Sequence, residues 1–153
     1  MADVANVGLV RPPVVYLGSV LLGLLLHFVW PLPLVRHPIA AALGVGLVMI
    51  AVGLFIAAVR TFRAAGTPVP GNRPTTTIVR TGPYRFSRNP IYLAFSVLQA
   101  GIALWVDSLW LLITLIPVLL LMSLLVIARE ERYLEARFPS EYPLYKASVR
   151  RWL

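Results

Sequence analysis

The segment that decides the fold is LWLLITLIPVLLLMSLLVIA, residues 109–128, which runs directly into REERYLEARF, residues 129–138. A helix needs about 20 apolar residues to cross the hydrocarbon core of a membrane, and this uncharged run is long enough. Cations alone would suffice to end such a span at the membrane surface. The acidic pair Glu130 and Glu131 therefore requires another explanation.

The composition of the whole chain agrees with a membrane protein. Of its 153 residues, 59% are hydrophobic and only 13% are charged, which is unusual for a soluble domain. The apolar runs are continuous and do not alternate, so they predict helices. The net charge of +8 is compatible with nucleic-acid binding, but the basic residues cluster beside the apolar runs, where they set topology and attract anionic lipid. We expect an all-α integral membrane protein that contacts membrane lipid and binds no nucleic acid.

The apolar runs predict a bundle of four transmembrane helices, which we expect to form a single domain over residues 1–153 together with the polar segments. Only Asp107 and Ser108 separate the third helix from the fourth, so these two helices should form a tight antiparallel hairpin. Pro117 should kink the fourth helix. The second helix contains small residues that allow close helix packing, among them Gly44, Gly46 and Gly53. The four predicted spans are residues 14–30, 39–59, 91–106 and 109–128.

Two polar segments remain outside these spans. Residues 60–90 form a loop rich in Gly, Pro, Thr and Arg, and loops of this length are often functional. Residues 129–153 form a C-terminal segment that should begin as an amphipathic helix, because Leu134 and Phe138 lie one turn apart on an apolar face.

The distribution of basic residues predicts the orientation of the protein. With the N-terminus in the cytoplasm, thirteen basic residues lie on the cytoplasmic side and only Arg36 lies opposite. Both polar segments and both termini are then cytoplasmic, and the protein belongs in the inner membrane. The thirteen residues are Arg11, Arg60, Arg63, Arg73, Arg80, Arg85, Arg88, Arg129, Arg132, Arg137, Lys146, Arg150 and Arg151.

The loop ends in GPYRFSRNPIY, residues 82–92, where polar and aromatic side chains arrive together at the start of the third span. Arginine presents a planar fork suited to a carboxylate or phosphate, and aromatic faces can hold an adenine ring or a cation. The alternative is a belt of Tyr and Arg that only anchors the helix among lipid headgroups. The candidate residues are Tyr84, Arg85, Arg88, Asn89 and Tyr92.

The acidic pair Glu130 and Glu131 follows directly after the fourth span. A helix C-terminus disfavours anions, and ionisable groups at a membrane edge are candidates for function. The alternative is a solvated helix with exposed ion pairs, each contributing about 0–1 kcal/mol. Both interpretations stay open on physical grounds.

These two polar stretches, separated by a helical hairpin, resemble the isoprenylcysteine carboxyl methyltransferase family, which includes related phospholipid N-methyltransferases. The family motif G-P-Y-R-x-x-R-H-P-x-Y is similar to residues 82–92, and the motif E-E-x-x-L followed by F-G-x-x-Y-x-x-Y and a basic end is similar to residues 130–151. Asn89 replaces the usual His, and Pro139-Ser140 replaces the usual Gly and the residue after it. Asn forms hydrogen bonds but cannot act as a titratable base.

The resemblance implies a site for S-adenosylmethionine on the cytoplasmic face and no metal. It implies that Glu130 or Glu131 binds the ammonium or ribose hydroxyls, and that Arg85 or Arg88 binds the carboxylate. Tyr84 or Tyr92 would contact the adenine or the sulfonium, Asn89 would position the cofactor, and Arg129 would orient the acceptor as the catalytic residue. The two tyrosines of the second motif, Tyr142 and Tyr145, complete the expected cofactor-binding set.

The acceptor implied by the resemblance is a lipophilic small molecule, first of all the carboxylate of a prenylcysteine-like compound. An ionised carboxylate needs no base, whereas an amine must lose a proton, and Asn89 cannot take it. A phospholipid amine acceptor, an NADPH-dependent membrane reductase and a non-catalytic membrane anchor remain as alternatives. The sequence does not determine the oligomeric state.

Overall fold

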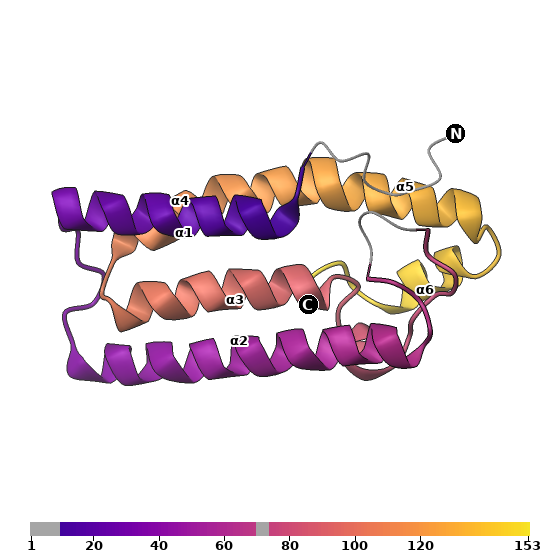
Figure 1. Ribbon diagram of the computed structural model, residues 1–153, viewed down its shortest axis with the longest axis horizontal. Helices are drawn as coiled ribbons and strands as arrows, with labels where there is room; N and C mark the ends of the chain where they lie inside the picture. The colour runs from indigo at the N-terminus through magenta and orange to yellow at the C-terminus, as the bar shows by residue number, and fades with distance from the viewer. Residues whose placement is uncertain (1–9, 70–73) are drawn as a thin grey trace. The chain divides into compact units, whose positions relative to one another are not determined.

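A computed structural model describes residues 10–69 and 74–153, and this part of the chain contains helices and turns without a strand. The all-α prediction is confirmed for these residues, while Arg73 lies outside them. Three of the helices begin at a proline, a residue that fits the first helical turn because no hydrogen-bond partner for its nitrogen is needed there. The helices in chain order are α1 (Pro12–Val29), α2 (Pro38–Ala64), α3 (Pro90–Trp105), α4 (Leu109–Leu121), α5 (Ala128–Arg137) and α6 (Tyr142–Ser148) (Figure 1).

Three helical stretches are long and apolar enough to cross a membrane: Pro12–Val29, Pro38–Ala64 and Leu109–Arg137. The last joins α4 to α5 through the π-helical turn Met122–Ile127, so the predicted C-terminal helix continues the span directly. Helix α3 is apolar but has 16 residues, short of the usual length. A fourth transmembrane helix and the amphipathic character of α5 therefore stay predictions.

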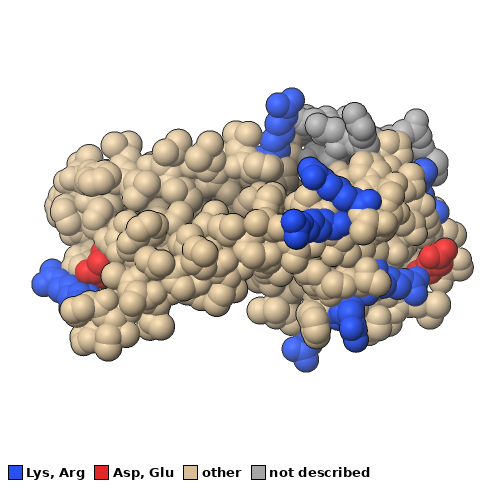
Figure 2. Space-filling model, turned by 60° about the horizontal axis from the view of Figure 1, so that its bottom comes forward, with Lys and Arg blue, Asp and Glu red and all other residues tan. Residues whose placement is uncertain are grey.

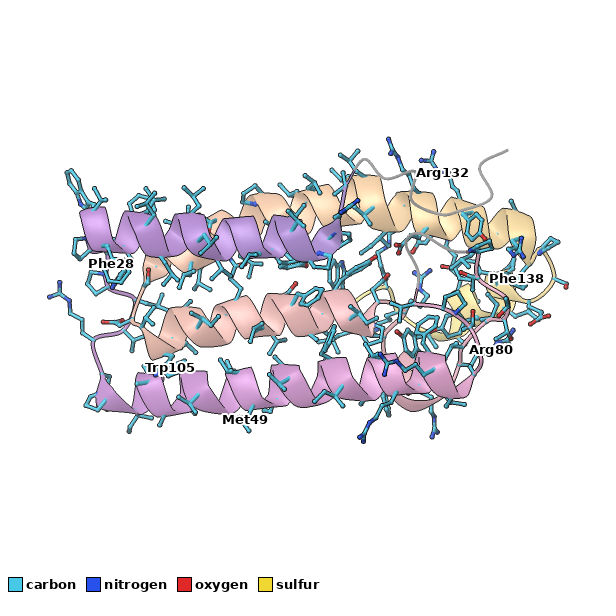
Figure 3. The ribbon with its side chains drawn as sticks, in the orientation of Figure 1. Phe28, Met49, Arg80, Trp105, Arg132 and Phe138 are labelled. Carbon is cyan, nitrogen blue, oxygen red and sulfur yellow. The ribbon has the colours of Figure 1, made fainter. Side chains whose placement is uncertain are left out.

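Large apolar side chains are exposed along the candidate membrane helices. Leu17 on α1 is 59% exposed, and Met49 on α2 is 67% exposed and points away from the neighbouring helices (Figure 3). Such surface is costly in water but compatible with the hydrocarbon of a bilayer. The length and apolar composition of these helices indicate a protein that spans a membrane.

The chain divides into two compact units, each assembled from segments that are distant in the sequence. The apolar unit comprises Pro12–Gly53 and Tyr92–Leu121. The polar unit comprises Leu54–Ile91 and Met122–Leu153, together with the described residues Val10 and Arg11. The prediction of one domain over residues 1–153 stays a prediction.

In the apolar unit, small residues allow backbones to approach closely. Helix α1 packs along α4 (Figure 1), and a Cβ atom added at Gly23 would lie 2.7 Å from Leu111 Cδ2. A Cβ atom at Gly44 of α2 would lie 2.6 Å from the carbonyl oxygen of Gly101 of α3. Gly46 has nothing within 4 Å of the corresponding position. Gly53 likewise has no described atom within 4 Å of this position, so the predicted role of glycine in close packing holds for Gly44 and not for Gly46 or Gly53.

A buried polar network joins three helices of the apolar unit. The fully buried Gln99 of α3 donates through Nε2 to Ser19 Oγ on α1 at 2.7 Å and to the carbonyl oxygen of Leu111 on α4 at 2.9 Å. Ser19 Oγ in turn donates to the carbonyl oxygen of Thr114 at 3.0 Å. Because unsatisfied polar groups are costly in an apolar environment, these bonds favour one arrangement of the three helices.

The connections at one end of the apolar unit are held by a single carboxylate. Helices α3 and α4 are joined by residues 106–108, as the predicted tight hairpin requires. Asp107 Oδ1 accepts backbone N–H bonds from Leu34 and Val35, each 2.8 Å, and from Arg36 at 3.3 Å. These bonds hold the pKa of Asp107 below its usual value, with the bond from Val35 as the largest cause. The carboxylate therefore ties the connection before α2 to the connection before α4.

The polar unit has a small core that fixes the loop onto α2. Ala58 and Phe62 of α2 pack with Val79 and Tyr84 of the loop, and the half-buried Ile91 packs against them. Apolar burial of this kind is the main favourable term in folding. The core brings the GPYRFSRNPIY stretch onto α2 within this unit.

Candidate active site

A glycine-dependent turn positions the first motif. Gly82 opens the 3₁₀ turn Gly82–Arg85 with φ of +57°, a backbone conformation that L side chains rarely adopt. A Cβ atom at Gly82 would also lie 2.6 Å from Thr61 Oγ1. The turn buries Tyr84, whose ring packs edge-on against Phe62 with ring centroids 4.8 Å apart. The turn thus determines where the following Arg88 and Asn89 lie.

The acidic pair lies in the first turn of α5 and is buried. Glu130 is 7% exposed and Glu131 is 6% exposed. Consecutive helical residues point about 100° apart, so the two carboxylates face different neighbours. The π-helical turn before α5 changes the helical register at this point, and such turns often occur at functional sites. Burial of both carboxylates argues against the solvated-helix interpretation.

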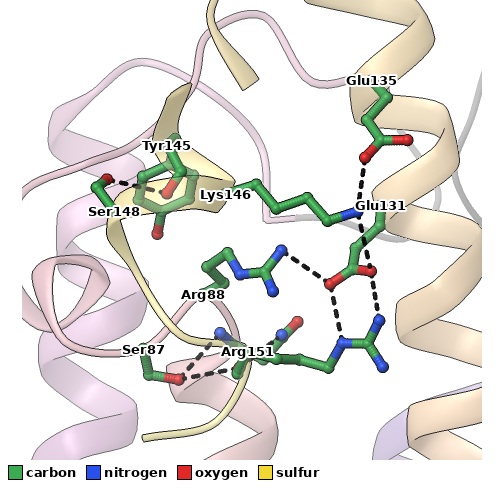
Figure 4. A network of polar contacts seen from close by, with 9 residues as sticks. Ser87, Arg88, Glu131, Glu135, Tyr145, Lys146, Ser148 and Arg151 are labelled. Carbon is green, nitrogen blue, oxygen red and sulfur yellow. Dashed lines mark hydrogen bonds and ion pairs between the residues drawn. The ribbon is translucent and has the colours of Figure 1, made fainter. Parts of the chain in front are cut away.

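Glu131 is surrounded by three cations of the polar unit (Figure 4). Arg151 makes two hydrogen bonds to it, from Nε to Oε1 at 3.0 Å and from Nη2 to Oε2 at 2.6 Å. Arg88 Nη1 lies 3.0 Å from Oε1. Lys146 Nζ lies 3.9 Å from Oε2 but only 2.7 Å from Glu135 Oε1. Glu131 is therefore contacted by three cations, of which Lys146 also pairs with Glu135.

Arg88 is the buried cation of this group, with a side chain 10% exposed. Its contact with Glu131 is short, but it lacks the direction of a hydrogen bond. Within the described part of the chain, Arg88 Nε and Nη1 have no hydrogen-bond partner. Buried N–H groups are nearly always satisfied in native proteins, so each exception calls for an explanation. An anionic ligand would supply the missing acceptors.

The end of the chain forms what we call the C-terminal strap, residues 149–153. The backbone N–H of Arg88 donates to the carbonyl oxygen of Arg150 at 2.9 Å, and Asn89 Nδ2 donates to the carbonyl oxygen of Arg151 at 2.9 Å. Trp152 Nε1 donates to Ser123 Oγ at 3.3 Å. The strap is therefore fastened both to the loop and to the helix that precedes α5.

Three buried tyrosines lie beside the charged cluster. Tyr145 of α6 donates its hydroxyl proton to the carbonyl oxygen of Tyr84 at 2.8 Å, and the rings of Tyr142 and Tyr145 lie 6.2 Å apart. Burial is the main cause that raises the pKa of each tyrosine, and the charge of Glu130 contributes at Tyr84. For Tyr142 a hydrogen bond from Arg88 acts in the opposite direction. All three hydroxyls therefore stay protonated at neutral pH.

Further bonds attach the loop and α6 to α5. Arg137 Nε donates to the carbonyl oxygen of Thr75 at 2.7 Å, and the backbone N–H of Thr75 donates to the Tyr133 hydroxyl at 3.3 Å. Arg80 Nη2 donates to the carbonyl oxygen of Glu141 at 3.0 Å, just before α6. These contacts close the polar unit around the charged cluster.

The structure brings most of the predicted site residues into the polar unit, but it does not group all of them. Arg85 and Arg129 are exposed and form no ion pair with any described residue. Tyr92 belongs to the apolar unit, where its carbonyl oxygen accepts hydrogen bonds from Tyr16 and Ser96. All predicted site residues except Tyr92 belong to the polar unit, and those that are not exposed there are Tyr84, Arg88, Asn89, Glu130, Glu131, Tyr142 and Tyr145.

Sequence reasoning missed Lys146 and Arg151 as members of the cluster. The only signal was the basic end of the second motif, which contains Arg151. That signal does not say which of several basic residues meets Glu131. Arg150, the neighbour of Arg151, is exposed and contributes its carbonyl oxygen instead.

The outer surface of the polar unit is basic. Figure 2 shows Lys and Arg side chains gathered in the right half of the view, and Arg132 points away from α5 in Figure 3. Anionic lipid headgroups attract such side chains beside membrane helices. Among residues 10–69 and 74–153, the exposed arginines of this unit that form no ion pair are Arg11, Arg60, Arg63, Arg85, Arg129, Arg132, Arg137 and Arg150.

Comparison with known proteins identifies the class to which this fold and site belong. Residues 39–141, about two thirds of the chain, match the model of the phospholipid methyltransferase family, and the chain belongs to this family. It is also 38% identical over 63 residues to an uncharacterized protein of Haemophilus influenzae, a match that covers 41% of this chain and 100% of that protein. No solved structure matches the chain.

Membership of the family supports methyl transfer to a lipophilic acceptor by a protein of the membrane. The matched range includes the first motif, residues 82–92, and the second motif as far as residue 141, and it ends before Tyr142, Tyr145, Lys146 and Arg151. The use of S-adenosylmethionine is the general expectation for such a family.

Proposed function

We propose that the chain is an S-adenosylmethionine-dependent membrane methyltransferase whose cofactor site is the charged and aromatic cluster of the polar unit. One observation carries the proposal: the buried guanidinium of Arg88 has two N–H groups without a hydrogen-bond acceptor among the described residues, and it lies beside the buried carboxylate of Glu131. An amino-acid carboxylate fits this guanidinium, and its ammonium fits a buried carboxylate. The side chains present therefore suit the charged part of the cofactor.

The roles can be divided among the residues by their surroundings. Arg88 is the better receptor for the carboxylate because Arg85 is exposed. We assign the ammonium or the ribose hydroxyls to Glu130, a buried carboxylate whose charge acts on Tyr84. Asn89 acts on the cofactor indirectly, through its bond to the C-terminal strap.

The tyrosines supply an aromatic environment without negative charge. Tyr84, Tyr142 and Tyr145 are buried, and their raised pKa values keep them neutral. Neutral aromatic rings attract cations through their faces. They therefore suit a positively charged sulfur or an adenine ring. We propose the same role for Tyr92.

S-adenosylmethionine supplies a methyl group on a positively charged sulfur, which is an intrinsically good leaving group. The task of the protein is then to hold donor and acceptor in line, and alignment alone can supply much of the acceleration. Arg129 is exposed one residue before Glu130, where it could orient an anionic acceptor. We assign it the catalytic role of holding an acceptor carboxylate.

The acceptor that we favour is the carboxylate of a prenylcysteine-like lipid, because an ionised carboxylate needs no base, whereas an amine must first lose a proton. Asn89 cannot take a proton, and the tyrosine hydroxyls stay protonated. A phospholipid amine is the second candidate, favoured by the family to which the chain belongs. In both cases the site would face the cytoplasm from the inner membrane, in accordance with the basic surface of the polar unit.

The proposal is tested with the full chain purified in detergent. Labelled S-adenosylmethionine should bind saturably, and Glu130→Gln should weaken binding, while Arg132→Met, an exposed control on the same helix, should leave it unchanged. NADPH should not bind. Transfer of labelled methyl to a prenylcysteine analogue or to phosphatidylethanolamine then identifies the acceptor. Absence of saturable S-adenosylmethionine binding by the folded protein would refute the proposal.

A further inference from the structure

We infer that Arg151 is a positioning residue that keeps Arg88 available for an anionic ligand, and that Asn89 holds Arg151 in place. The identity of the ligand rests on the proposed function. The roles of Arg88 and Arg151 rest on their contacts with Glu131. Both guanidinium groups reach the same carboxylate, but they do so in different ways. The difference determines which of the two arginines remains free to bind.

Arg151 makes the two-pronged contact with Glu131. Its Nε and Nη2 lie 3.0 Å and 2.6 Å from the two different oxygens, which is the parallel arrangement that arginine and carboxylate favour. Arg88 is left with one contact of 3.0 Å to Oε1 that lacks hydrogen-bond geometry. One carboxylate cannot offer both oxygens in parallel to two guanidinium groups. Arg151 therefore excludes Arg88 from the contact that Arg88 would otherwise form.

Because Arg151 occupies both oxygens of Glu131, Arg88 is left with N–H groups that no described residue satisfies. Its Nε and Nη1 are buried and have no acceptor among residues 10–69 and 74–153, although a carboxylate lies within contact distance. Lys146 does not take part in this competition, because its nitrogen is 2.7 Å from Glu135 and 3.9 Å from Glu131. The arrangement leaves a buried cation that is paired by charge but unsatisfied in hydrogen bonding, which suits the capture of an anion.

The C-terminal strap supplies the geometry that makes this competition possible. The bond from Arg88 N to the carbonyl oxygen of Arg150 and the bond from Asn89 Nδ2 to the carbonyl oxygen of Arg151 set the two backbones side by side. The side chains of residues 88 and 151 then converge on Glu131 (Figure 4). Asn89 is suited to this task because its amide donates a hydrogen bond at every pH.

The first test replaces Arg151 by methionine, which resembles the aliphatic part of the arginine side chain and carries no charge. Arg88 should then form the two-pronged contact with Glu131, and its N–H groups should no longer be available to an anionic ligand. Affinity for S-adenosylmethionine should fall at least about tenfold, the effect of losing one charge-assisted hydrogen bond. Affinity for decarboxylated S-adenosylmethionine should change by less than about twofold, as for a residue that makes no contact with that ligand. The matched control is Arg150→Met, which removes an exposed side chain and leaves the backbone bond to Arg88.

Two further variants separate positioning from general support of the fold. Arg151→Lys keeps the charge but cannot form parallel bonds to two oxygens, so it should behave like Arg151→Met. The double variant Arg151→Met/Glu131→Gln removes the carboxylate with which Arg88 would otherwise form the two-pronged contact. It should therefore recover affinity for S-adenosylmethionine. Normal binding by Arg151→Lys, or no recovery in the folded double variant, would overturn the inference.

A ligand-free crystal structure of Arg151→Met decides the inference separately from the proposed function. The inference requires two nitrogen–oxygen contacts between Arg88 and Glu131 in that structure. A single contact, as in the parent protein, would contradict it. Failure of the parent protein to bind S-adenosylmethionine would instead reject the proposed function, and the variant structure would still decide the role of Arg151.

Discussion

The Tyr145 hydroxyl donates a hydrogen bond of 2.8 Å to the main-chain carbonyl oxygen of Tyr84, although the two residues are 61 positions apart. One residue belongs to the loop before α3 and the other to α6 near the end of the chain. The bond therefore joins the two polar stretches that the sequence suggested would share a site. Both residues are buried, so water does not readily replace the lost partner when one is removed.

Tyr145→Phe should lower the free energy of unfolding by about 1–3 kcal/mol, because it leaves a buried carbonyl oxygen without a donor. Unfolding of the detergent-solubilised protein measures the effect. Leu144→Ala in the same helix removes a side chain that is 68% exposed and should cost less than about 0.5 kcal/mol. Equal losses for the two variants would show that the hydroxyl bond does not stabilise the polar unit.

Glu131→Gln should lower stability much more than Glu135→Gln. The side chain of Glu131 is 7% exposed and neutralises the buried Arg88, so removing its charge should cost about 2–4 kcal/mol. The cost is less than for a fully buried pair, because the side chain of Arg151 is 37% exposed. Glu135 is 40% exposed, and its pair with Lys146 should contribute about 0–1 kcal/mol. The same unfolding measurement compares the two, and similar values would contradict the central position of Glu131.

Gly44→Ala should destabilise the apolar unit, because the added Cβ atom would lie 2.6 Å from the carbonyl oxygen of Gly101 and would force the backbones apart. A cost of about 1–3 kcal/mol is expected for such overpacking. Gly46→Ala, two residues away on the same helix with nothing within 4 Å, should be neutral or slightly stabilising, by up to about 1 kcal/mol. Thermal unfolding of the two variants in detergent tests the packing directly.

Asp107 should make part of the stability of the apolar unit depend on pH. The pKa of Asp107 is lowered in the folded state, and the hydrogen bond from Val35 is the largest cause. The contribution of Asp107 to the free energy of unfolding is therefore present above the unfolded-state pKa and is lost as the pH falls through the folded-state pKa. Asp107→Asn keeps an oxygen acceptor but no charge. The parent protein should be more stable than this variant at pH 7, and the difference should shrink below about pH 4. A difference that is constant between pH 7 and pH 3 would contradict the role of the charge.

The sequence predicts the helices well because membrane helices depend on local composition. Continuous apolar runs such as residues 109–128 must form internal hydrogen bonds in lipid, which leaves the helix as the natural structure. Boundaries were less predictable: α2 continues to Ala64, past Arg60 and Arg63, since a helix can extend beyond the membrane with polar residues. The direct continuation of α4 into α5 through a π-helical turn has no signal in the residue pattern.

The candidate site was predictable in its residue types and only partly in its arrangement. Arg85 and Arg88 are equivalent in the sequence, but the 3₁₀ turn leaves one exposed and buries the other. The contact of Arg151 with Glu131 depends on the path of the C-terminal strap, which no local pattern determines. The substitution of Asn89 for the histidine of similar motifs is understood only once its bond to the carbonyl oxygen of Arg151 is known.

The central claim is that the buried guanidinium of Arg88 binds the carboxylate of S-adenosylmethionine. Equilibrium binding of S-adenosylmethionine and of its decarboxylated analogue to the parent protein and to Arg88→Met tests it most directly. In the parent protein, loss of the ligand carboxylate should weaken binding at least about tenfold, the value of a charge-assisted hydrogen bond. In folded Arg88→Met the two ligands should bind alike. If the variant still prefers S-adenosylmethionine by the same factor as the parent protein, Arg88 is not the carboxylate receptor and the claim is wrong.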